Sequence, residues 1–508
     1  MNMKIIAMYL PQFHRVKEND EWWGEGFTDW VTVKKATPLL ENHYQPRVPL
    51  NDYYYDLLDK KTMQWQAELM QDYDVDGMCI YHYWFKDGRK ILEKPAENLL
   101  KWKDINMSFC FCWANETWAR SWSNIRSKNT WADKYEKSLE QNDTGILLEQ
   151  KYGDESDWRQ HFDYLLSFFK DDRYIKVDNK PVFLIYQTAL ITCLSEMLEM
   201  WNLWAKENHF NGIYFIGTNT NYATEKVLDR VLYREPQYSN AKIRSLKNKD
   251  EMSIKTEYVD VWNELLDNIG DKKNVSYGGF VGYDDTPRRG SAGLLIDGQT
   301  PELFKQYLTE LLAKNVVNNS PFTFINAWNE WGEGMYLEPD EKDGYAYLKA
   351  IPYAKEHYKE YIEKYKKQLE RSEEGLLTEY KALSEKCAKY EGYWRILDAW
   401  LRHKEEGLSL ETYFIKHGIK TIAIYGGGML GKHLLEELKG GSITVEYVVD
   451  RKADALKLGI PVYSIEDRLP EVDAIVVSAT FVYAEIKEKL QEKGYKNIIS
   501  LENIVMEI

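Results

Sequence analysis

Two glutamates, Glu330 and Glu333, lie three residues apart in the segment Asn-Ala-Trp-Asn-Glu-Trp-Gly-Glu-Gly at residues 326–334. A carboxyl pair can process a glycosidic bond when one protonated carboxyl donates to the leaving oxygen and the other assists at the anomeric carbon. On a strand this spacing would separate the two side chains, but a turn after a strand brings them together. Gly332 and Gly334 favour such a turn. Two exposed loop glutamates are the alternative interpretation.

The composition is rich in aromatic residues, with 18 Trp and 37 Tyr among 508 residues. Flat rings stack on the C–H faces of sugars, and Tyr and Trp also carry a polar group that can bond hydroxyls. Trp328, Trp331 and Tyr336 could wall a cleft in which two crowded carboxyls repel each other, so that one pKa rises. Heavy use of aromatic residues in packing would produce the same composition.

Short apolar runs alternate with helical patterns through the first 330 residues, which predicts a parallel sheet. The predicted strands are residues 4–10, 77–85, 107–114, 181–186, 212–217, 275–281 and 322–327, and the predicted helices include 61–73, 157–169, 191–208 and 301–315. A (β/α)8 TIM-type barrel needs an eighth strand, for which residues 227–234 are the candidate, although this segment could equally end a helix. An open doubly wound sheet is the alternative fold.

Polar and aromatic side chains follow several of these runs, at residues 9–14, 81–84, 113–116 and 328–330. Barrel active sites are built at the C-terminal ends of the strands, so this placement favours the barrel. We therefore expect one pocket to be surrounded by Tyr9, Tyr81, Trp113, Glu116, Glu330 and Glu333.

The motifs resemble those of two related families. Residues 329–334, followed by Leu-Glu-Pro at 337–339, are similar to the Asn-Glu-Trp-His-Glu-Gly…Glu-Pro signature of family-99 glycoside hydrolases, the endo-α-1,2-mannosidases and mannanases. Residues 7–14, 23–30, 81–84, 111–116 and 283–288 resemble still more closely the WbsX group of bacterial surface-polysaccharide (O-antigen or capsule) clusters, described as glycosyltransferases or family-99-like proteins. The resemblance covers roughly residues 3–360 and implies a (β/α)8 barrel.

The resemblance also implies roles for the pair. Glu333 would match the family's general acid/base, and Glu330 the carboxylate that assists the sugar 2-hydroxyl, which attacks the anomeric carbon to give a 1,2-anhydro sugar, with retention. The family's His between Trp and Glu is Gly332 here, so sugar and linkage specificity do not carry over. The candidate substrate-binding residues are Tyr9, Trp30, Tyr81, His82, Tyr83, Trp113, Asn115, Glu116, Asp284, Arg288, Trp328, Asn329 and Trp331.

The sequence changes character after residue 353, which divides the chain into a barrel at 1–353, a charged helical connector at 354–415 and a small Rossmann-like α/β domain at 416–508. A short coiled coil is an alternative for the connector, although sustained heptads are not evident. In the last domain Gly426, Gly428 and Gly431 form a dinucleotide-type turn, and Asp450 follows at the distance of a ribose-binding acid. A nucleotide or nucleotide-sugar could bind there. A structural or docking role is the alternative.

Several other classes are disfavoured. The net charge of −15 argues against nucleic acid as a partner, and no apolar run approaches the roughly 20 residues of a membrane span. The short apolar N-terminus lacks a cleavage site, so we expect a cytoplasmic protein. Five scattered cysteines predict reduced thiols. Neither Cys110 with Cys112 nor His14 with His82 supplies a full ligand set, so we expect no metal.

These observations predict an enzyme that processes glycosidic bonds in an oligosaccharide or polysaccharide and needs no cofactor in the barrel. A glycosyltransferase that uses an activated sugar donor is the main alternative. A glycan-binding scaffold without catalysis is another. Docking to a polysaccharide-assembly complex would fit all three.

Overall fold

The computed structural model describes residues 3–119, 146–245, 255–268 and 274–508. The chain divides into two compact units, Met1–Ser372 and Glu373–Ile508. The predicted connector at 354–415 spans the boundary between these units. Its first residues, including Ala354 and Tyr358, lie in the core of the first unit, whereas Ile396 and Trp400 lie in a core of the second. The boundary falls within one long helix, α13 (Ile362–Glu405).

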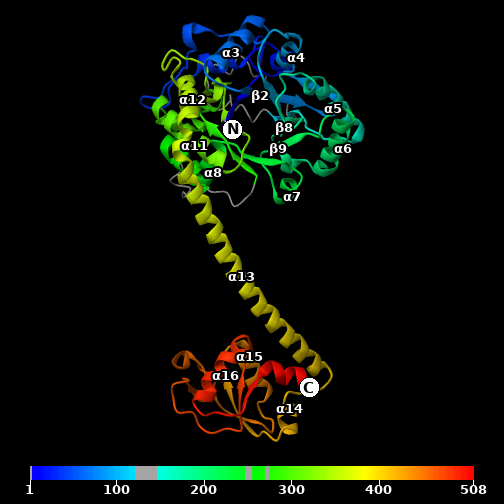
Figure 1. Ribbon diagram of the computed structural model, residues 1–508, viewed down its shortest axis with the longest axis vertical. Coiled ribbons are helices and arrows are strands. Elements are labelled where there is room, and N and C mark those ends of the chain that lie inside the picture. Colours follow the sequence, from blue (N-terminus) through cyan, green and yellow to red (C-terminus); the bar gives the residue numbers. More distant parts are fainter. Residues whose placement is uncertain (1–2, 120–145, 246–254, 269–273) are drawn as a thin grey trace, which may run out of the picture. The chain divides into compact units, whose positions relative to one another are not determined.

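Eight parallel strands close into a barrel in the first unit (Figure 1). They are β1 (Lys4–Tyr9), β2 (Gly77–Trp84), β4 (Phe109–Trp113), β8 (Lys180–Ile185), β9 (Tyr214–Gly217), β10 (Arg230–Tyr233), β12 with β13 (Val275–Tyr277, Gly279–Phe280) and β16 (Phe322–Asn326). The seventh strand is interrupted at Gly278, so that β12 pairs with β10 and β13 pairs with β16. Because β16 also pairs with β1, the ring is closed. This confirms the predicted barrel and excludes the open sheet. The strand that the sequence left uncertain, within residues 227–234, is β10.

Helices surround the barrel on its outer side (Figure 1). The larger ones are α3 (Lys60–Asp72), α4 (Lys94–Lys101), α5 (Glu155–Phe169), α6 (Leu194–Glu207), α8 (Gln237–Ser245), α9 (Tyr258–Asp267), α11 (Pro301–Val317) and α12 (Ala346–His357). Their starts follow local chemistry. Asp59 caps α3 through the Lys61 N–H, and Thr300 caps α11, whose first residue is a proline.

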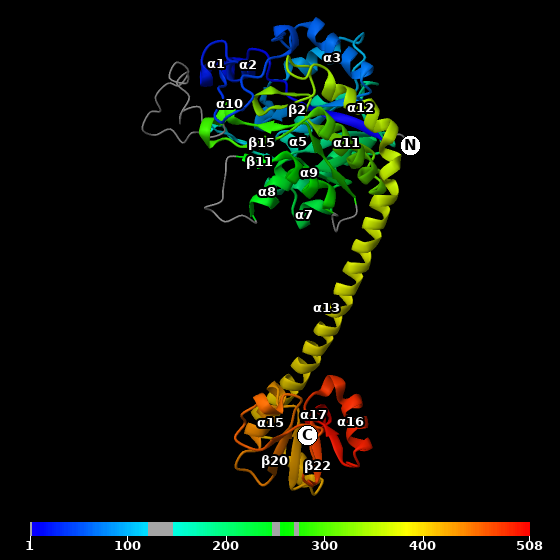
Figure 2. The ribbon, with the colours of Figure 1, turned by 90° about the vertical axis from the view of Figure 1, so that its left-hand side faces the viewer.

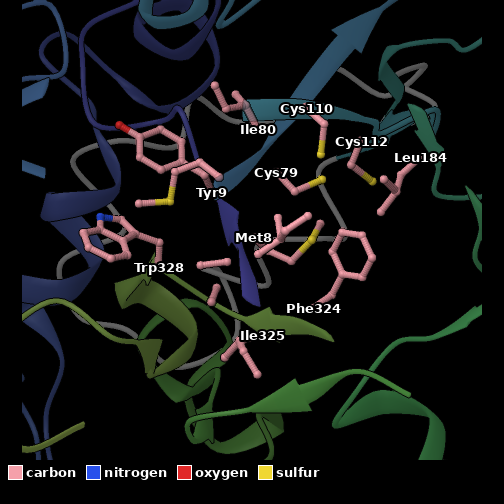
Figure 3. Close-up of a cluster of buried hydrophobic side chains, with 14 of the residues drawn as sticks. Met8, Tyr9, Cys79, Ile80, Cys110, Cys112, Leu184, Phe324, Ile325 and Trp328 are labelled. Atoms are coloured by element: carbon pink, nitrogen blue, oxygen red, sulfur yellow. The ribbon is translucent and has the colours of Figure 1, made fainter. Parts of the chain in front are cut away.

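Strand alternation decides which side chains face the barrel interior. Met8 points toward Cys112 and Phe324 in the interior, whereas Tyr9, the next residue, turns away from them (Figure 3). The Tyr9 hydroxyl instead donates to Gln66 Oε1 of α3 at 2.8 Å. A residue at the C-terminal end of a strand therefore reaches the active face only when its side chain points into the barrel.

The second unit contains a five-stranded parallel sheet in the order β21-β20-β19-β22-β23 (Figure 2). Ile422 and Ile424 of its central strand pack into one core, and Ala423 and Tyr425 into another, so both faces of the sheet are covered. This strand order is the doubly wound one. Its elements are β19 (Thr421–Tyr425), β20 (Thr444–Val449), β21 (Val462–Tyr463), β22 (Ala474–Val477), β23 (Ile498–Ser500), α14 (Glu411–Lys416), α15 (Met429–Glu437), α16 (Tyr483–Glu492) and α17 (Leu501–Glu507).

None of the helices in the described ranges combines the length and the apolar character that crossing a bilayer requires.

Candidate active site

A cavity of about 380 Å³ opens at the C-terminal ends of the barrel strands. Its wall comes from the C-terminal end of β2 and from segments that follow β1, β4, β8, β10, β13 and β16, so that only closure of the barrel assembles it. Of the predicted site residues, those that line the cavity are Tyr81, Tyr83, Glu116, Arg288, Glu330 and Glu333.

The two glutamates meet at one guanidinium. Glu330 ends the short strand β17 (Asn329–Glu330), and a 3-10 turn, η9 (Trp331–Glu333), carries Glu333 back to the same side. Gly334 has a φ of +60°, which completes the turn. Arg288 Nη1 lies 2.7 Å from Glu333 Oε1, and Arg288 Nη2 lies 3.3 Å from Glu330 Oε2. The predicted turn therefore places both carboxyl groups in the same part of the cavity.

Asp29, the first residue of α2 (Asp29–Lys35), holds the other edge of this guanidinium. Its Oδ1 lies 3.2 Å from Arg288 Nε and its Oδ2 lies 3.1 Å from Nη2. The Gly332 N–H also donates to Asp29 Oδ2, at 3.2 Å. Because the Asp29 side chain is only 3% exposed, this is a largely desolvated, two-point ion pair.

Gly332 has no room for a side chain. A Cβ at this position would lie 2.7 Å from both Arg288 Nε and Asp29 Oδ2. The ion pair thus occupies the space into which a histidine at this position would extend. The family-99 signature has a histidine where this chain has Gly332. Here Arg288 and Asp29, which come from other segments of the chain, occupy the space that the histidine side chain would need.

The buried position of Glu330 controls its protonation. Burial raises the pKa of Glu330 to about 8, the nearby charge of Glu333 raises it as well, and Arg288 opposes both effects. Glu330 therefore keeps its proton at neutral pH. Burial also raises the pKa of Glu116, which accepts a hydrogen bond from Gln187 Nε2 at 2.7 Å.

This pKa shift predicts how stability depends on pH. A carboxyl whose pKa is higher in the folded than in the unfolded chain stabilises the fold fully below about pH 4.5, and this contribution disappears as pH rises through about 8. We expect the Glu330→Gln variant to gain about 4 kcal/mol of unfolding free energy relative to the unsubstituted protein between pH 5 and pH 9, because each unit of pKa difference corresponds to about 1.4 kcal/mol. Urea unfolding at both pH values measures this gain.

The matched control for this experiment is Glu25→Gln, because the Glu25 side chain is 90% exposed. The two variants should differ in the pH dependence of their stability. Equal pH dependence in both would contradict the raised pKa of Glu330.

Three predicted residues, Tyr9, His82 and Trp113, lie near the C-terminal ends of strands but face the surrounding helices, so the expectation that Tyr9 and Trp113 border the pocket is wrong. Trp113 Nε1 donates to the Trp84 carbonyl at 3.0 Å, and His82 Nε2 lies 2.9 Å from His161 Nε2 of α5. Burial lowers the pKa of His82 to about 3, so this imidazole is neutral. Alternate residues of a strand point to opposite faces, and these residues occupy the positions that point outward, toward the helices.

Six more predicted residues are enclosed behind the cavity wall and do not line it: Trp30, Asn115, Asp284, Trp328, Asn329 and Trp331. They hold the lining segments in place. Asn329 bonds both the N–H and the carbonyl of Leu10, at 2.7 and 3.0 Å. Asp284 accepts from Gln45 Nε2 at 2.6 Å, and Trp331 stacks on Tyr336 with centroids 3.8 Å apart.

Other lining residues were missed by the sequence analysis, namely Tyr186, Arg234, Tyr283, Asp285 and Arg289. Arg234 Nη1 donates to the Tyr186 hydroxyl at 3.0 Å, and Nη2 to the Tyr81 hydroxyl at 3.4 Å. Tyr186 and Arg234 end the predicted strands 181–186 and 227–234, so the rule of polar groups at strand ends could have found them. Asp285 was missed because its neighbour Asp284 was chosen.

Residues 5–351 match the family model described as "Glycosyltransferase WbsX". This chain belongs to the WbsX family. The match confirms the resemblance that the sequence motifs indicated.

Two curated relatives are similar to this WbsX chain, both named "Uncharacterized protein WxcX", from strains B100 and ATCC 33913 of Xanthomonas campestris pv. campestris. Each is 30% identical, over 356 and 357 residues, which is 68% of this chain and 48% of the relative. The chain thus spans about half the length of the curated relatives it matches.

Solved structures with a similar fold include a GH99 endo-alpha-mannosidase from Bacteroides thetaiotaomicron in complex with BIS-TRIS-propane. It is 14% identical with a TM-score of 0.43, and the alignment covers 72% of this chain and 98% of that one. A "Glycoside hydrolase-like protein" is 11% identical with a TM-score of 0.42, covering 70% of this chain and 94% of that one.

Three of the five cysteines of this WbsX protein lie in its core. Cys79, Cys110 and Cys112 are buried free thiols of the barrel, and their sulfur atoms lie close together (Figure 3). Within the part of the chain that the structure describes, no group of three or more His, Cys, Asp or Glu is arranged to hold a metal.

The glycine turn of the second unit joins β19 to α15. Gly426 has a φ of +103°, and a Cβ at Gly431 would lie 2.0 Å from the Gly426 carbonyl oxygen, so backbone packing explains both glycines. A Cβ at Gly428 would meet no atom within 4 Å. Asp450 Oδ2 accepts from the Gly427 N–H at 2.8 Å. A nucleotide or nucleotide-sugar at this turn stays a prediction.

Proposed function

We propose that this protein breaks or forms glycosidic bonds in the barrel cavity, with Glu330 and Glu333 as the reacting carboxyl groups. The observation that carries the proposal is the contact of both carboxyls with Arg288 at the C-terminal face of a closed barrel. The Glu330 carboxyl is buried and has a raised pKa, and the Glu333 carboxyl accepts a charged hydrogen bond at 2.7 Å. Different environments for two neighbouring carboxyls are what acid and base roles require.

Burial raises the pKa of Glu330 and so favours a proton on this carboxyl in the free site, whereas the family-99 resemblance gives the general-acid role to Glu333. In both assignments one carboxyl protonates the leaving oxygen and the other, ionised, assists the attacking hydroxyl. For a retaining hydrolase of the family-99 type, the attacking group is the sugar 2-hydroxyl and the product is a 1,2-anhydro sugar that water then opens. Substrates with good leaving groups separate the two assignments, because they need no general acid.

The proposed substrate is an α-linked oligosaccharide or polysaccharide, processed in the cytoplasm during surface-polysaccharide metabolism. Aromatic side chains of the cavity wall support a carbohydrate ligand, since Trp23, Phe27, Tyr81, Trp118 and Tyr283 line it. The proposal also includes docking of the whole protein, and not of the barrel alone, to a polysaccharide-assembly complex.

A glycosyltransferase is the second candidate, and the arginines favour it. Arg234, Arg288 and Arg289 all line the cavity, and guanidinium groups bind phosphate oxygens well. When an activated sugar donor transfers its sugar to the acceptor, the leaving group is a phosphate, which needs little protonation, so that one carboxylate could serve to activate the acceptor hydroxyl. The description of the matched family also supports this candidate.

A product assay separates the candidates. The full chain is incubated with cell-extracted glycans alone, and with the same glycans plus each member of a panel of nucleotide sugars, and the products are identified by mass spectrometry. Cleavage without a donor supports the hydrolase, whereas donor-dependent growth of the glycan supports the transferase. Glycan binding without either product, in a protein that folds normally, would contradict both enzymatic candidates. The protein would then be a glycan-binding scaffold without catalysis.

A further inference from the structure

Helix α13 (Ile362–Glu405) is unusually long for a globular protein. Its 44 residues correspond to about 66 Å, several times the average helix length. Near its C-terminal end one face packs on the second unit, where Ile396 and Trp400 are buried in the core. Arg395 also pairs with Glu502 of α17, and Trp400 Nε1 donates to Glu437 of α15.

A second face of α13 carries large apolar side chains that are open to solvent. Leu383 is 60% exposed, Tyr390 58%, Trp394 66% and Leu401 60%. Cys387 is exposed as well, and Leu397 is only partly covered. We call these six residues the α13 stripe. At 100° per residue, the centre of the stripe lies about 120° around the helix from Ile396 and Trp400. Leu397 is at the border of the packed face, and the other five residues of the stripe are exposed.

The spacing of the stripe is that of a coiled coil. Its members, at 383, 387, 390, 394, 397 and 401, follow one another in steps of 4, 3, 4, 3 and 4 residues over about 27 Å. An average period of 3.5 keeps a stripe facing a partner helix, whereas a helix packed on a globular core has a broader face. A contiguous exposed apolar surface of this kind marks an interaction site.

We propose that the α13 stripe forms a parallel, in-register coiled coil with a second copy of this chain. The spacing places Leu383, Tyr390 and Leu397 at heptad position d, and Cys387, Trp394 and Leu401 at position a. Leucine at d is typical of parallel two-stranded coiled coils.

Charges beside the stripe match this self-pairing. Lys386 falls at position g and Glu391 at the following position e, and in a parallel pair these positions face each other across the interface. The two-fold symmetry of the pair creates this attraction twice. Both residues are exposed, and neither forms an ion pair with another residue in the described part of the chain.

The first test is the mass of the full chain in solution, measured by sedimentation over a range of concentrations. A chain of 60.0 kDa should sediment as a dimer. The double variant Leu383→Glu/Trp394→Glu should be monomeric, whereas Leu203→Glu, at a 48% exposed leucine of α6, should stay dimeric. A monomeric unsubstituted chain, or a dimer that survives the double variant, would overturn the proposal.

Cys387 tests the orientation. In a parallel, in-register pair the two Cys387 residues face each other at a core position, within reach of a disulfide. Oxidation with copper-phenanthroline should give a covalent dimer on a non-reducing gel, which Cys387→Ser abolishes and Cys193→Ser, at the other partly exposed thiol, does not. A dimer by mass that fails to cross-link through Cys387 would overturn the parallel arrangement.

The charge pair gives an independent control that leaves the apolar stripe intact. Lys386→Glu should weaken dimerisation about tenfold, because two glutamates then face each other. Lys386→Glu/Glu391→Lys should restore it. Equal affinity in all three proteins would show that these positions do not meet. Since none of these residues lies in the barrel, the outcome is independent of the proposed catalytic function.

Discussion

Replacing Glu333 by Gln should lower the turnover of an unactivated substrate about 10²- to 10⁴-fold, because the variant can neither donate nor accept the proton at the reacting oxygen. Glu330→Gln should have an effect of similar size, since its carboxyl shares the Arg288 guanidinium with Glu333. The measurement is the initial rate on the substrate identified by the product assay. Glu25→Gln, at an exposed carboxyl, is the control.

The two variants should differ on a substrate with a good leaving group. The variant that lacks the general acid should recover most of its rate, whereas the variant that lacks the ionised partner should not. If the proton donor is Glu333, as the family resemblance implies, Glu333→Gln is the variant that recovers. Full activity of Glu333→Gln on the unactivated substrate would show that this residue has no acid role, and it would leave the barrel fold unaffected.

Replacing Arg288 by Met should cost about 3 kcal/mol of unfolding free energy, in addition to the loss of activity. Asp29 is 3% exposed and would lose both of its hydrogen bonds to the guanidinium, which leaves a buried charge without a partner. Chemical denaturation measures the change. Arg288→Lys should rescue little, because an ammonium group cannot bond both Asp29 oxygens and Glu333 at once.

Arg289→Met is the matched control, since the neighbouring Arg289 side chain is 47% exposed and contacts Asp285 at 3.3 Å. Its loss should cost less, because the Asp285 carboxyl, although only 5% exposed, still accepts from the Leu294 N–H at 2.6 Å and from the Tyr283 hydroxyl at 3.1 Å. Adding Asp29→Asn to Arg288→Met should restore much of the stability and none of the activity, because the unpaired charge is gone but the carboxyl clamp is not rebuilt. Equal losses for Arg288→Met and Arg289→Met would contradict the role of Arg288 as the buried link.

The local elements of this protein could be predicted from its sequence. Runs such as 4–10 and 77–85 are apolar on both faces because barrel strands are covered by helices outside and by each other inside, and β1 and β2 agree with them closely. Even residues 227–234, which could have ended a helix, contain β10. The turn after β16 and its glutamate pair were also predictable, because glycines such as Gly332 and Gly334 allow the backbone conformations of a tight turn.

Only the tertiary structure decided whether each side chain at a strand end points into the barrel or toward the helices. A shift of one residue along a strand moves a side chain from the interior to the helices, so a motif such as Tyr81-His82-Tyr83 contains both kinds. Tyr81 and Tyr83 line the cavity, whereas His82 contacts His161 of α5. The sequence predicted where the strands end but not which of the end residues point into the barrel.

Partners that lie far apart in the chain were also beyond sequence reasoning. Arg288 and Asp29 are 259 residues apart and meet because β13 pairs with β16 and β16 with β1. The exclusion of a side chain at Gly332 follows from that meeting. For α13 the sequence determined a charged helix, but its 3.5-residue stripe emerged only once the packed face was known. Local sequence determines the elements because hydrophobic periodicity is local, whereas the site depends on contacts that only chain closure creates.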